Sequence, residues 1–198
     1  PRAALDHWWA ARLARIAEWV VALEQSRRAE LGVPQALAHE QTGEMVFPGG
    51  FVLRGRADRI ERAADGGISL IDYKTGTVPS AAAVEAGIAP QLPLEAVMAE
   101  AGMFGEEFFA AVTELAYMRL SGRADAGEET RLFKSKPEKL RAAVERAGAA
   151  LQDLFDRFAD ERTAYLAAPH PSRVNIYDAF AGISRRAEWA GEDQDDGD

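Results

Sequence analysis

The stretch Arg54–Gly76, RGRADRIERAADGGISLIDYKTG, predicts two short strands joined by a glycine-rich turn. The first strand carries Asp58, and the second carries Asp72 and Lys74. Because side chains alternate along a strand, Asp72 and Lys74 lie on the same face of the second strand. If the two strands pair as a hairpin, Asp58 lies beside Asp72. The stretch therefore predicts a β-hairpin that gathers two carboxylates and one amine.

Two ionised carboxylates at short range repel each other unless a cation lies between them. Oxygen ligands of this kind suit Mg²⁺ or Mn²⁺, ions that polarise a phosphate and activate a water molecule. A neighbouring lysine can orient that water and offset charge on the phosphate. The set is typical of a centre that hydrolyses phosphodiesters. Two plainer interpretations stay open: Asp72 and Lys74 form a surface ion pair, and Asp58 pairs with Arg56 or Arg59.

Further segments accompany the hairpin. PQLPLEA occupies residues 90–96, AYMRLSG occupies 116–122, and YLAAPHP occupies 165–171. Together with Asp58 and the DYKTG motif at 72–76, these segments resemble the PD-(D/E)XK nucleases of the RecB type. Within that family, the chain is most similar to the AddB-type nuclease domains of AddAB helicase–nucleases.

The resemblance implies an α/β fold, with a restriction-endonuclease-like mixed sheet flanked by helices. It implies Mg²⁺ or Mn²⁺ as the cofactor. The residues that it assigns to catalysis are Asp58, Asp72, Lys74 and Gln91. The metal ligands that it implies are Asp58, Asp72 and the backbone carbonyl of Tyr73, together with Glu40 as an upstream acid.

The glutamine motif departs from the family pattern. In that pattern the glutamine begins a helix and a tyrosine follows four residues later, whereas Glu95 stands at the tyrosine position here. Gln91 either reaches the site, where it holds a water or a phosphate, or is an ordinary polar residue at a helix start. We expect Glu95 to add negative charge at the rim of the site.

The upstream ligand is the second departure. Nucleases of this family take a further acid or histidine from a helix that precedes the first strand. The candidates by position are His7, Glu18, Glu24, Glu30 and Glu40. Glu40 is the predicted ligand, and a residue located before Pro1 is the alternative. Because the chain starts with Pro1 rather than Met, we interpret it as a piece of a larger protein.

The resemblance implies a metal-dependent DNA nuclease domain in a helicase–nuclease that processes double-strand DNA breaks for recombinational repair. Its expected partners are DNA and an AddA-like helicase–nuclease subunit, in the bacterial cytoplasm near the nucleoid. Two alternatives stay open. One is a catalytically degenerate module with a nuclease fold that docks a partner or guides DNA. The other is a nuclease that acts on RNA, since both nucleic acids are phosphodiesters.

Composition limits these functions. The 198 residues include no cysteine, so the chain itself cannot hold a disulfide, a cysteine-based zinc site or an iron–sulfur cluster. No apolar run is long enough to span a bilayer, and no Walker-type phosphate-binding motif occurs. The net charge of −9 predicts weak DNA affinity for the isolated chain. Two basic clusters are candidates for holding phosphate: Arg54, Arg56, Arg59 and Arg62, and Arg131, Lys134, Lys136, Lys139 and Arg141.

We predict one nuclease domain over residues 1–185 and an acidic, disordered tail over 186–198. The pattern predicts helices over 3–30, 90–101 and 137–166, strands over 36–47, 51–61, 68–74 and 114–120, and a polar loop over 121–127. Trp8, Trp9 and Trp19 have helical spacing. This spacing favours packing in a core over stacking on nucleic-acid bases.

Overall fold

The computed structural model describes residues 2–166 and 183 of the chain. A five-stranded sheet has the strand order β1-β2-β3-β4-β5. β3 and β4 are parallel, whereas the other neighbouring strands are antiparallel. The strands are β1 (Ala36–Val46), β2 (Val52–Arg62), β3 (Ile68–Lys74), β4 (Val112–Leu120) and β5 (Gly127–Leu132). The predicted mixed sheet is confirmed.

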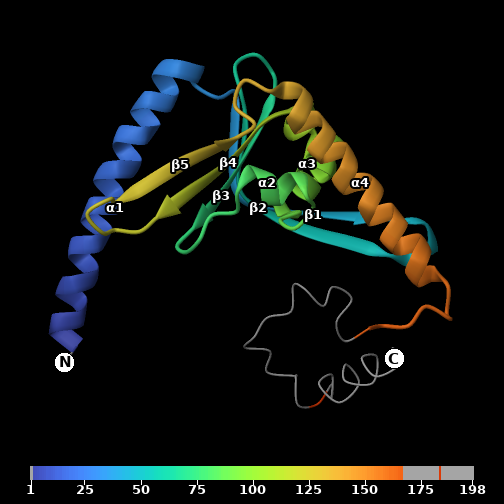
Figure 1. Ribbon diagram of the computed structural model, residues 1–198. Coiled ribbons are helices and arrows are strands. Elements are labelled where there is room, and N and C mark those ends of the chain that lie inside the picture. The colour runs from blue at the N-terminus through green and yellow to red at the C-terminus, as the bar shows by residue number, and fades with distance from the viewer. Residues whose placement is uncertain (1, 167–182, 184–198) are drawn as a thin grey trace, which may run out of the picture. The chain divides into compact units, whose positions relative to one another are not determined.

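Helices lie on both faces of this sheet (Figure 1). They are α1 (Arg2–Leu31), α2 (Ala81–Glu85), α3 (Gln91–Glu100) and α4 (Pro137–Ala159), with short 3₁₀ turns η1 (Pro48–Gly50) and η2 (Glu106–Phe108). α2 and α3 form the crossover that a parallel pair such as β3 and β4 requires. The sheet and the helices that pack on it belong to one compact unit, Pro1–Phe155. The predicted tail over 186–198 lies outside the described residues.

The main hydrophobic core lies between the sheet and α3. From β3 and β4, Leu70 and Leu115 are fully buried, and from α3, Leu92 and Ala96 are fully buried. Burying an aliphatic side chain of this size contributes about 1.5–3 kcal/mol relative to leaving it exposed. α4 adds Leu140 and two smaller residues to the same cluster. This face of β3 is the one that carries Asp72 and Lys74, so the core fixes the strand that presents them.

The opposite face of the sheet is covered by α1 and has only a small apolar cluster. Ile71, Ala116 and Met118 are buried there, with Leu23 and Tyr73 packed against them. Most of the docking is ionic. It joins Glu24, Arg27, Arg28 and Glu30 of α1 to Arg59, Glu61, Glu114, Glu129 and Arg131 of the sheet.

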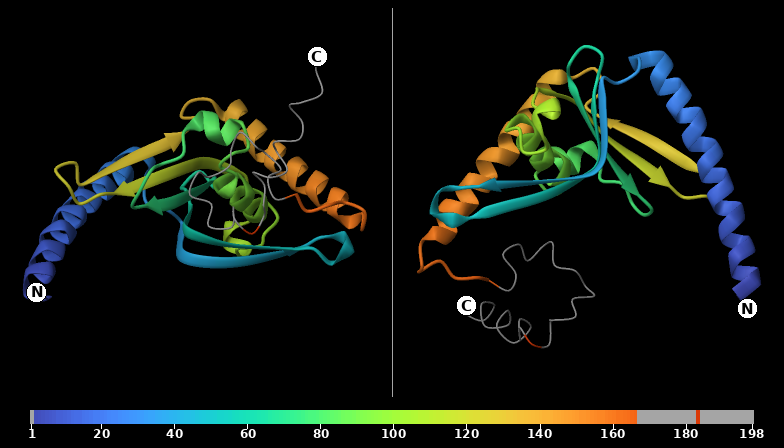
Figure 2. Two further views of the ribbon diagram at one scale, coloured as in Figure 1. Left: turned by 60° about the horizontal axis from the view of Figure 1, so that its bottom comes forward. Right: turned by 180° about the vertical axis from the view of Figure 1, so that it is seen from behind.

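β1 and β2 form a long hairpin that separates from β3 (Figures 1 and 2). β2 pairs with β1 along its length from Val52 to Arg62, but it pairs with β3 only over 59–62. At the tip, Phe51 stacks on Phe155 of α4 with ring centroids 4.7 Å apart. The facing residues Gly43 and Gly55 allow the hairpin to lie close to the chain after α3 and to α3 itself, because a Cβ would come within 2.7 Å of Met103 and of Met98, respectively. The hairpin is therefore held at its outer end.

Three differences from the sequence-based expectations concern local structure. β5 was not predicted, because its sequence GEETRL is polar and the strand lies at the sheet edge. α4 ends at Ala159 rather than at residue 166, since the hydroxyl of Thr163 donates to the carbonyl of Arg157 and closes the last turn. The core prediction for the tryptophans is wrong for Trp8 and Trp9, which are 52% and 48% exposed.

Trp19 differs from the other two tryptophans. It packs so closely on Gly127 of β5 that a Cβ at this position would overlap the indole. The C-terminal half of α1 thus docks on the sheet, while the N-terminal half exposes its aromatic residues. Within the described residues, no helix has the length and apolar character needed to cross a membrane.

Candidate active site

The candidate site lies where β2 separates from β3. Arg59 and Ile71 are the last paired residues of the two strands, so Asp58 and Asp72 occupy the next position of the register. Oδ2 of Asp58 accepts a hydrogen bond of 3.0 Å from the backbone N–H of Tyr73. This side chain therefore takes the place of a strand-to-strand hydrogen bond, and it brings the two aspartates together at the fork.

The backbone carbonyl of Tyr73 lies on the same edge of β3. In a strand, the N–H and C=O of one residue point to the same neighbouring strand. Because the N–H of Tyr73 points toward Asp58, the carbonyl also lies on the β2 side. The fork thus collects carboxylate and carbonyl oxygens, which are the donors that Mg²⁺ and Mn²⁺ prefer.

Asp72 is the buried member of the pair, with an exposed fraction of 1%. Its Oδ1 accepts a hydrogen bond of 2.8 Å from Lys74 Nζ. Its Oδ2 is also buried and lies 2.7 Å from the same ammonium, but it accepts no well-directed hydrogen bond. Burial raises the pKa of Asp72, Lys74 opposes this effect, and the charge of Asp58 adds to it. Burial and the charge of Asp58 therefore disfavour the ionised form of Asp72 more than Lys74 favours it.

Gln91 links the two charged groups of β3 to α3. This residue opens α3, and Pro90 and Pro93 stand beside it at the helix start, where a missing N–H costs least. Its Nε2 donates to Asp72 Oδ1 at 2.6 Å, and its Oε1 accepts from Lys74 Nζ at 3.0 Å. Of the two interpretations left open by the sequence, the geometry favours the one in which Gln91 reaches the site.

Glu95 lies inside the site rather than at its rim. It is 6% exposed, and its Oε1 accepts a hydrogen bond of 3.1 Å from Gln91 Nε2. Burial, together with the charges of Asp72 and Asp58, raises the pKa of Glu95 to about 7. The spacing of four residues from Gln91 places Glu95 on the same face of α3, but sequence alone did not indicate its burial.

Tyr117 is a further neighbour that sequence reasoning missed. It pairs in register with Asp72 on the adjacent strand β4, and its ring centroid lies 5.9 Å from Lys74 Nζ. Burial raises the pKa of Tyr117 to about 12, and the charges of Asp72 and Glu95 add to this rise. Only the parallel register of β3 and β4 reveals this contact, and no local sequence pattern encodes that register.

Glu40 lies across from Asp58, between the pairs His39–Arg59 and Gln41–Ala57, but within the described residues it does not form a metal-binding group with the two aspartates. Glu40 adopts a left-handed φ of 52° and interrupts the pairing of β1 with β2. Its carboxylate is 59% exposed and pairs with Arg56 at 2.8 Å. Across the described residues, no group of three or more histidines and acids is arranged to hold a metal ion.

The donor set nonetheless fits Mg²⁺. This ion is commonly held by one or two carboxylates and keeps several waters or substrate oxygens as its other ligands. Asp58, Asp72 and the carbonyl of Tyr73 meet that requirement, and the unsatisfied Oδ2 of Asp72 is an oxygen that a cation would engage. Two of the remaining upstream candidates are engaged elsewhere: Glu24 pairs with Arg59, and Glu30 pairs with Arg131.

The basic clusters expected to hold phosphate are largely neutralised within the chain. Arg59 and Arg131 lie in ion pairs under α1. Arg54 pairs with Glu44 at 2.7 Å on the hairpin. The other pairs are Arg56–Glu40, Lys139–Glu85 and Arg141–Glu100. Most of the cationic groups in these two clusters are therefore already paired with acids of the same chain.

Comparison with known proteins agrees with this geometry. The family model of the PD-(D/E)XK nuclease superfamily matches residues 1–173. The chain belongs to this superfamily. The mixed five-stranded sheet with flanking helices is accordingly a restriction-endonuclease-like fold.

Relatives among curated proteins come from Rickettsia. An uncharacterized protein of Rickettsia bellii is 31% identical over 93 residues, which are 46% of this chain and 11% of the relative. Uncharacterized proteins of Rickettsia conorii and Rickettsia felis are each 48% identical over 44 residues, which are 22% of this chain and 5% of each relative. The matched part of the chain is therefore about a tenth or less of the length of these relatives.

Proposed function

We propose that this chain is the metal-dependent nuclease domain of a larger DNA-processing protein, and that it hydrolyses phosphodiester bonds. The observation that carries the proposal is the convergence of Asp58, Asp72 and Lys74 at the fork between β2 and β3. An ordinary surface ion pair would lie in solvent, whereas Asp72 is 1% exposed and has an unsatisfied oxygen. A buried group of this kind in a superfamily of nucleases is a candidate for catalysis.

Each residue has a distinct role in the proposed reaction. Mg²⁺ or Mn²⁺, held by Asp58, Asp72 and the carbonyl of Tyr73, would supply Lewis acidity toward the phosphate and a more acidic water. Lys74 is positioned by Asp72 and Gln91, so its ammonium is held in place to orient water and offset charge on the phosphate. Gln91 hydrogen-bonds to both the ammonium of Lys74 and the carboxylate of Asp72 and so fixes their relative positions.

The finer assignment rests on sequence resemblance. The DYKTG and PQLPLEA motifs support an AddB-type nuclease domain, in a helicase–nuclease that processes double-strand breaks together with an AddA-like partner. DNA as the substrate and a place near the bacterial nucleoid belong to the same proposal. The much greater length of the curated relatives is consistent with a chain that works as one part of a larger protein.

A second candidate is a nuclease-fold module without catalysis that docks a partner or guides DNA. Two observations favour it. Glu95 replaces the tyrosine of the family motif, and among the residues described there is no acid or histidine that joins Asp58 and Asp72 as a third ligand. An acid or histidine supplied to the fork by another part of the full-length protein would argue against it.

The test is cleavage of end-labelled linear DNA by the full-length protein, with Mg²⁺, with Mn²⁺ and with EDTA. We expect metal-dependent cleavage that falls about 10²–10⁴-fold in Asp72→Asn and in Lys74→Ala, because each removes a group that acts on the reacting phosphate or water. Arg54→Ala is the matched control, since this arginine is exposed and pairs only with Glu44 among its described ion pairs. Undiminished cleavage in both site variants would contradict the mechanism, and absence of cleavage in the wild type under all conditions would favour the scaffold.

A further inference from the structure

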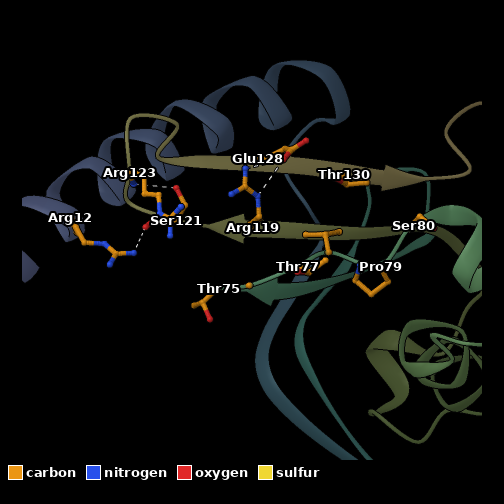
Figure 3. A pocket seen from close by; sticks show the side chains of 12 residues that line it. Arg12, Thr75, Thr77, Pro79, Ser80, Arg119, Ser121, Arg123, Glu128 and Thr130 are labelled. Atoms are coloured by element: carbon orange, nitrogen blue, oxygen red, sulfur yellow. Dashed lines mark hydrogen bonds and ion pairs between the residues drawn. The ribbon is translucent and has the colours of Figure 1, made fainter. Parts of the chain in front are cut away.

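A polar cavity of about 600 Å³ (Figure 3) is lined in part by Arg119, which pairs in register with Lys74 of the candidate active site. One wall is the segment 75–80, which begins at the residue directly after Lys74. The C-terminal part of β4, the loop between β4 and β5, the start of β5 and Arg12 of α1 complete the lining. A ligand in this cavity would therefore lie next to the proposed cleavage centre.

The lining of the cavity is suited to a phosphate backbone. Three arginines contribute to it, Arg12, Arg119 and Arg123. Hydroxyl groups surround them, from Thr75, Thr77, Ser80, Ser121 and Thr130. Arginine, serine and threonine are among the side chains that contact phosphate oxygens in nucleic-acid complexes. The cavity thus gathers phosphate-binding groups in a chain whose net charge is −9.

The cavity contains one acid, Glu128, and this limits which arginines are free to bind. Arg119 pairs with Glu128 at 3.1 Å and with Asp125 at 2.9 Å. A phosphate would have to compete with these two exposed carboxylates for Arg119. Arg12 donates to the backbone carbonyl of Ser121, and its Nε is buried without a hydrogen-bond partner. Arg123 is exposed, and Arg12 lines the cavity. Because neither has an acidic partner among the described ion pairs, these two arginines are the main candidates for contact with phosphate.

Two exposed tryptophans adjoin the cavity through Arg12. The guanidinium of Arg12 lies 4.5 Å from the ring centroid of Trp8 and 5.2 Å from that of Trp9. The two indoles contact each other edge to face with centroids 5.0 Å apart, and about half of each side chain is exposed. Indole faces of this kind are stacking surfaces for unpaired bases, whereas bases in a duplex are already stacked.

We propose that Trp8, Trp9 and the arginine-lined cavity form an anchoring site for single-stranded DNA, separate from the cleavage centre. Bases stack on the two tryptophans while phosphates of the same strand bind Arg12 and Arg123. The strand then reaches Asp72 along the segment that begins at Thr75. The choice of DNA rests on the proposed function, but the anchoring itself does not require cleavage. Contacts of this kind are independent of base sequence.

Photo-crosslinking tests the site in the full-length protein without interference from other DNA-binding parts. A single-stranded oligothymidylate with 5-iodouracil substitutions is irradiated with the protein in EDTA, and the crosslinked peptides are mapped by mass spectrometry. We expect crosslinks to the peptide that contains Trp8 and Trp9. Crosslinks found only elsewhere in the protein would overturn the proposal.

Binding measured in EDTA by fluorescence anisotropy gives the affinities. Trp8→Ala with Trp9→Ala should weaken binding of the single strand about tenfold or more, because each stacked base is worth about 1–3 kcal/mol. Arg123→Ala should reduce the slope of log Kd against log salt concentration by about 1, the amount expected for one phosphate contact. Arg54→Ala on the exposed hairpin is the matched control. Since both tryptophans are half exposed, circular dichroism of their variants should match the wild type.

Failure of anchoring and failure of the nuclease are distinguishable. Asp72→Asn should bind and crosslink the single strand like the wild type even if it cleaves nothing. Equal affinity for blunt duplex DNA of the same length, tighter binding of the matching RNA, or unchanged affinity in the tryptophan variant would each overturn the proposal.

Discussion

Buried acids have pKa values that are shifted in opposite directions on the two faces of the sheet. On the face covered by α3, the pKa of Asp72 is raised, chiefly by burial, and burial raises the pKa of Glu95 to about 7. On the face covered by α1, burial also raises the pKa of Glu61, but hydrogen bonds from Arg59 and Arg28 outweigh it and the pKa is lowered. Comparable burial is therefore accompanied by opposite pKa shifts, because only the α1 face supplies arginines that stabilise the ionised carboxylate.

The difference separates structural charges from candidate catalytic charges. Under α1, four arginines pair with five glutamates. The arginines are Arg27, Arg28, Arg59 and Arg131, and the glutamates are Glu24, Glu30, Glu61, Glu114 and Glu129. Under α3, Asp72 and Glu95 both accept hydrogen bonds from Gln91, and among the described ion pairs Lys74 is the one cation that contacts these acids. The arginines of the α1 face pair with its buried glutamates, whereas the α3 face has, among the described residues, fewer positive charges than acids. A divalent cation bound at this face would supply the missing positive charge.

The largest stability effect is expected from the α1 face. Arg27 is 1% exposed and contacts Glu61, Glu114 and Glu129. Arg27→Ala should lower the free energy of unfolding by about 3–5 kcal/mol, because it leaves buried glutamates without their partner. Urea unfolding followed by circular dichroism measures the loss. A loss no greater than that of Arg54→Ala on the exposed hairpin would show that the network does not hold α1.

A smaller effect of opposite sign is expected on the α3 face. The pKa of Glu95 is raised from 4.5 to about 7 in the folded chain, so its contribution to stability is full below pH 4.5 and is lost as the pH rises to about 7. Glu95→Gln should remove this loss and stabilise the protein at pH 8 by at most about 3 kcal/mol. The two proteins should be similar in stability at pH 4.5.

Urea unfolding in EDTA at pH 4.5 and pH 8 measures the effect of Glu95→Gln, with metal withheld so that no cation offsets the charge. Glu85→Gln serves as a control at a glutamate of the crossover that is paired with Lys139. If Glu95→Gln were destabilising at pH 8, the ionised form of Glu95 would be satisfied in the fold and the contrast between the two faces would fail.

The smallest effect concerns acid sensitivity. A hydrogen bond from Arg59 lowers the pKa of Glu24, so this carboxylate stabilises the docking of α1 above pH 4.5, and the contribution is lost as the pH falls through the folded-state pKa. Glu24→Gln should cost about 1 kcal/mol at pH 7 and less at pH 3. In a protein whose other three tryptophans are replaced by phenylalanine, the fluorescence of Trp19, which packs on Gly127, reports the docking. If Glu24→Gln lowered the free energy of unfolding equally at both pH values, the effect would come from the packing of the side chain and not from the charge of the carboxylate.

The sequence predicted best where neighbouring residues decide the structure. Alternation along the hairpin was enough to place Asp72 and Lys74 on one face, and the proline-flanked start of α3 was enough to direct Gln91 to a helix terminus. The two strand boundaries around Asp65 and the following glycines also follow from local turn chemistry. These features need no knowledge of contacts between distant segments.

Features that depend on distant segments were not predictable. The burial of Glu95 and the position of Tyr117 follow from how the crossover helix packs on a parallel strand pair. Arg59 and Arg131 have partners on α1, far away in the chain, so the sequence indicated them as candidates for holding phosphate rather than as members of an ion-pair network. The helical spacing of Trp8 and Trp9 did not show that the sheet ends before it reaches them.

The amide of Tyr73 gives the fork a built-in spectroscopic probe. Its N–H donates to the carboxylate of Asp58 instead of to a backbone carbonyl. Any event that changes the charge on Asp58, whether protonation or capture of an ion, will shift the nuclear magnetic resonance frequency of this one amide. A titration watched at this single nitrogen would reveal the state of the carboxylate directly, even in a protein that turns over no substrate.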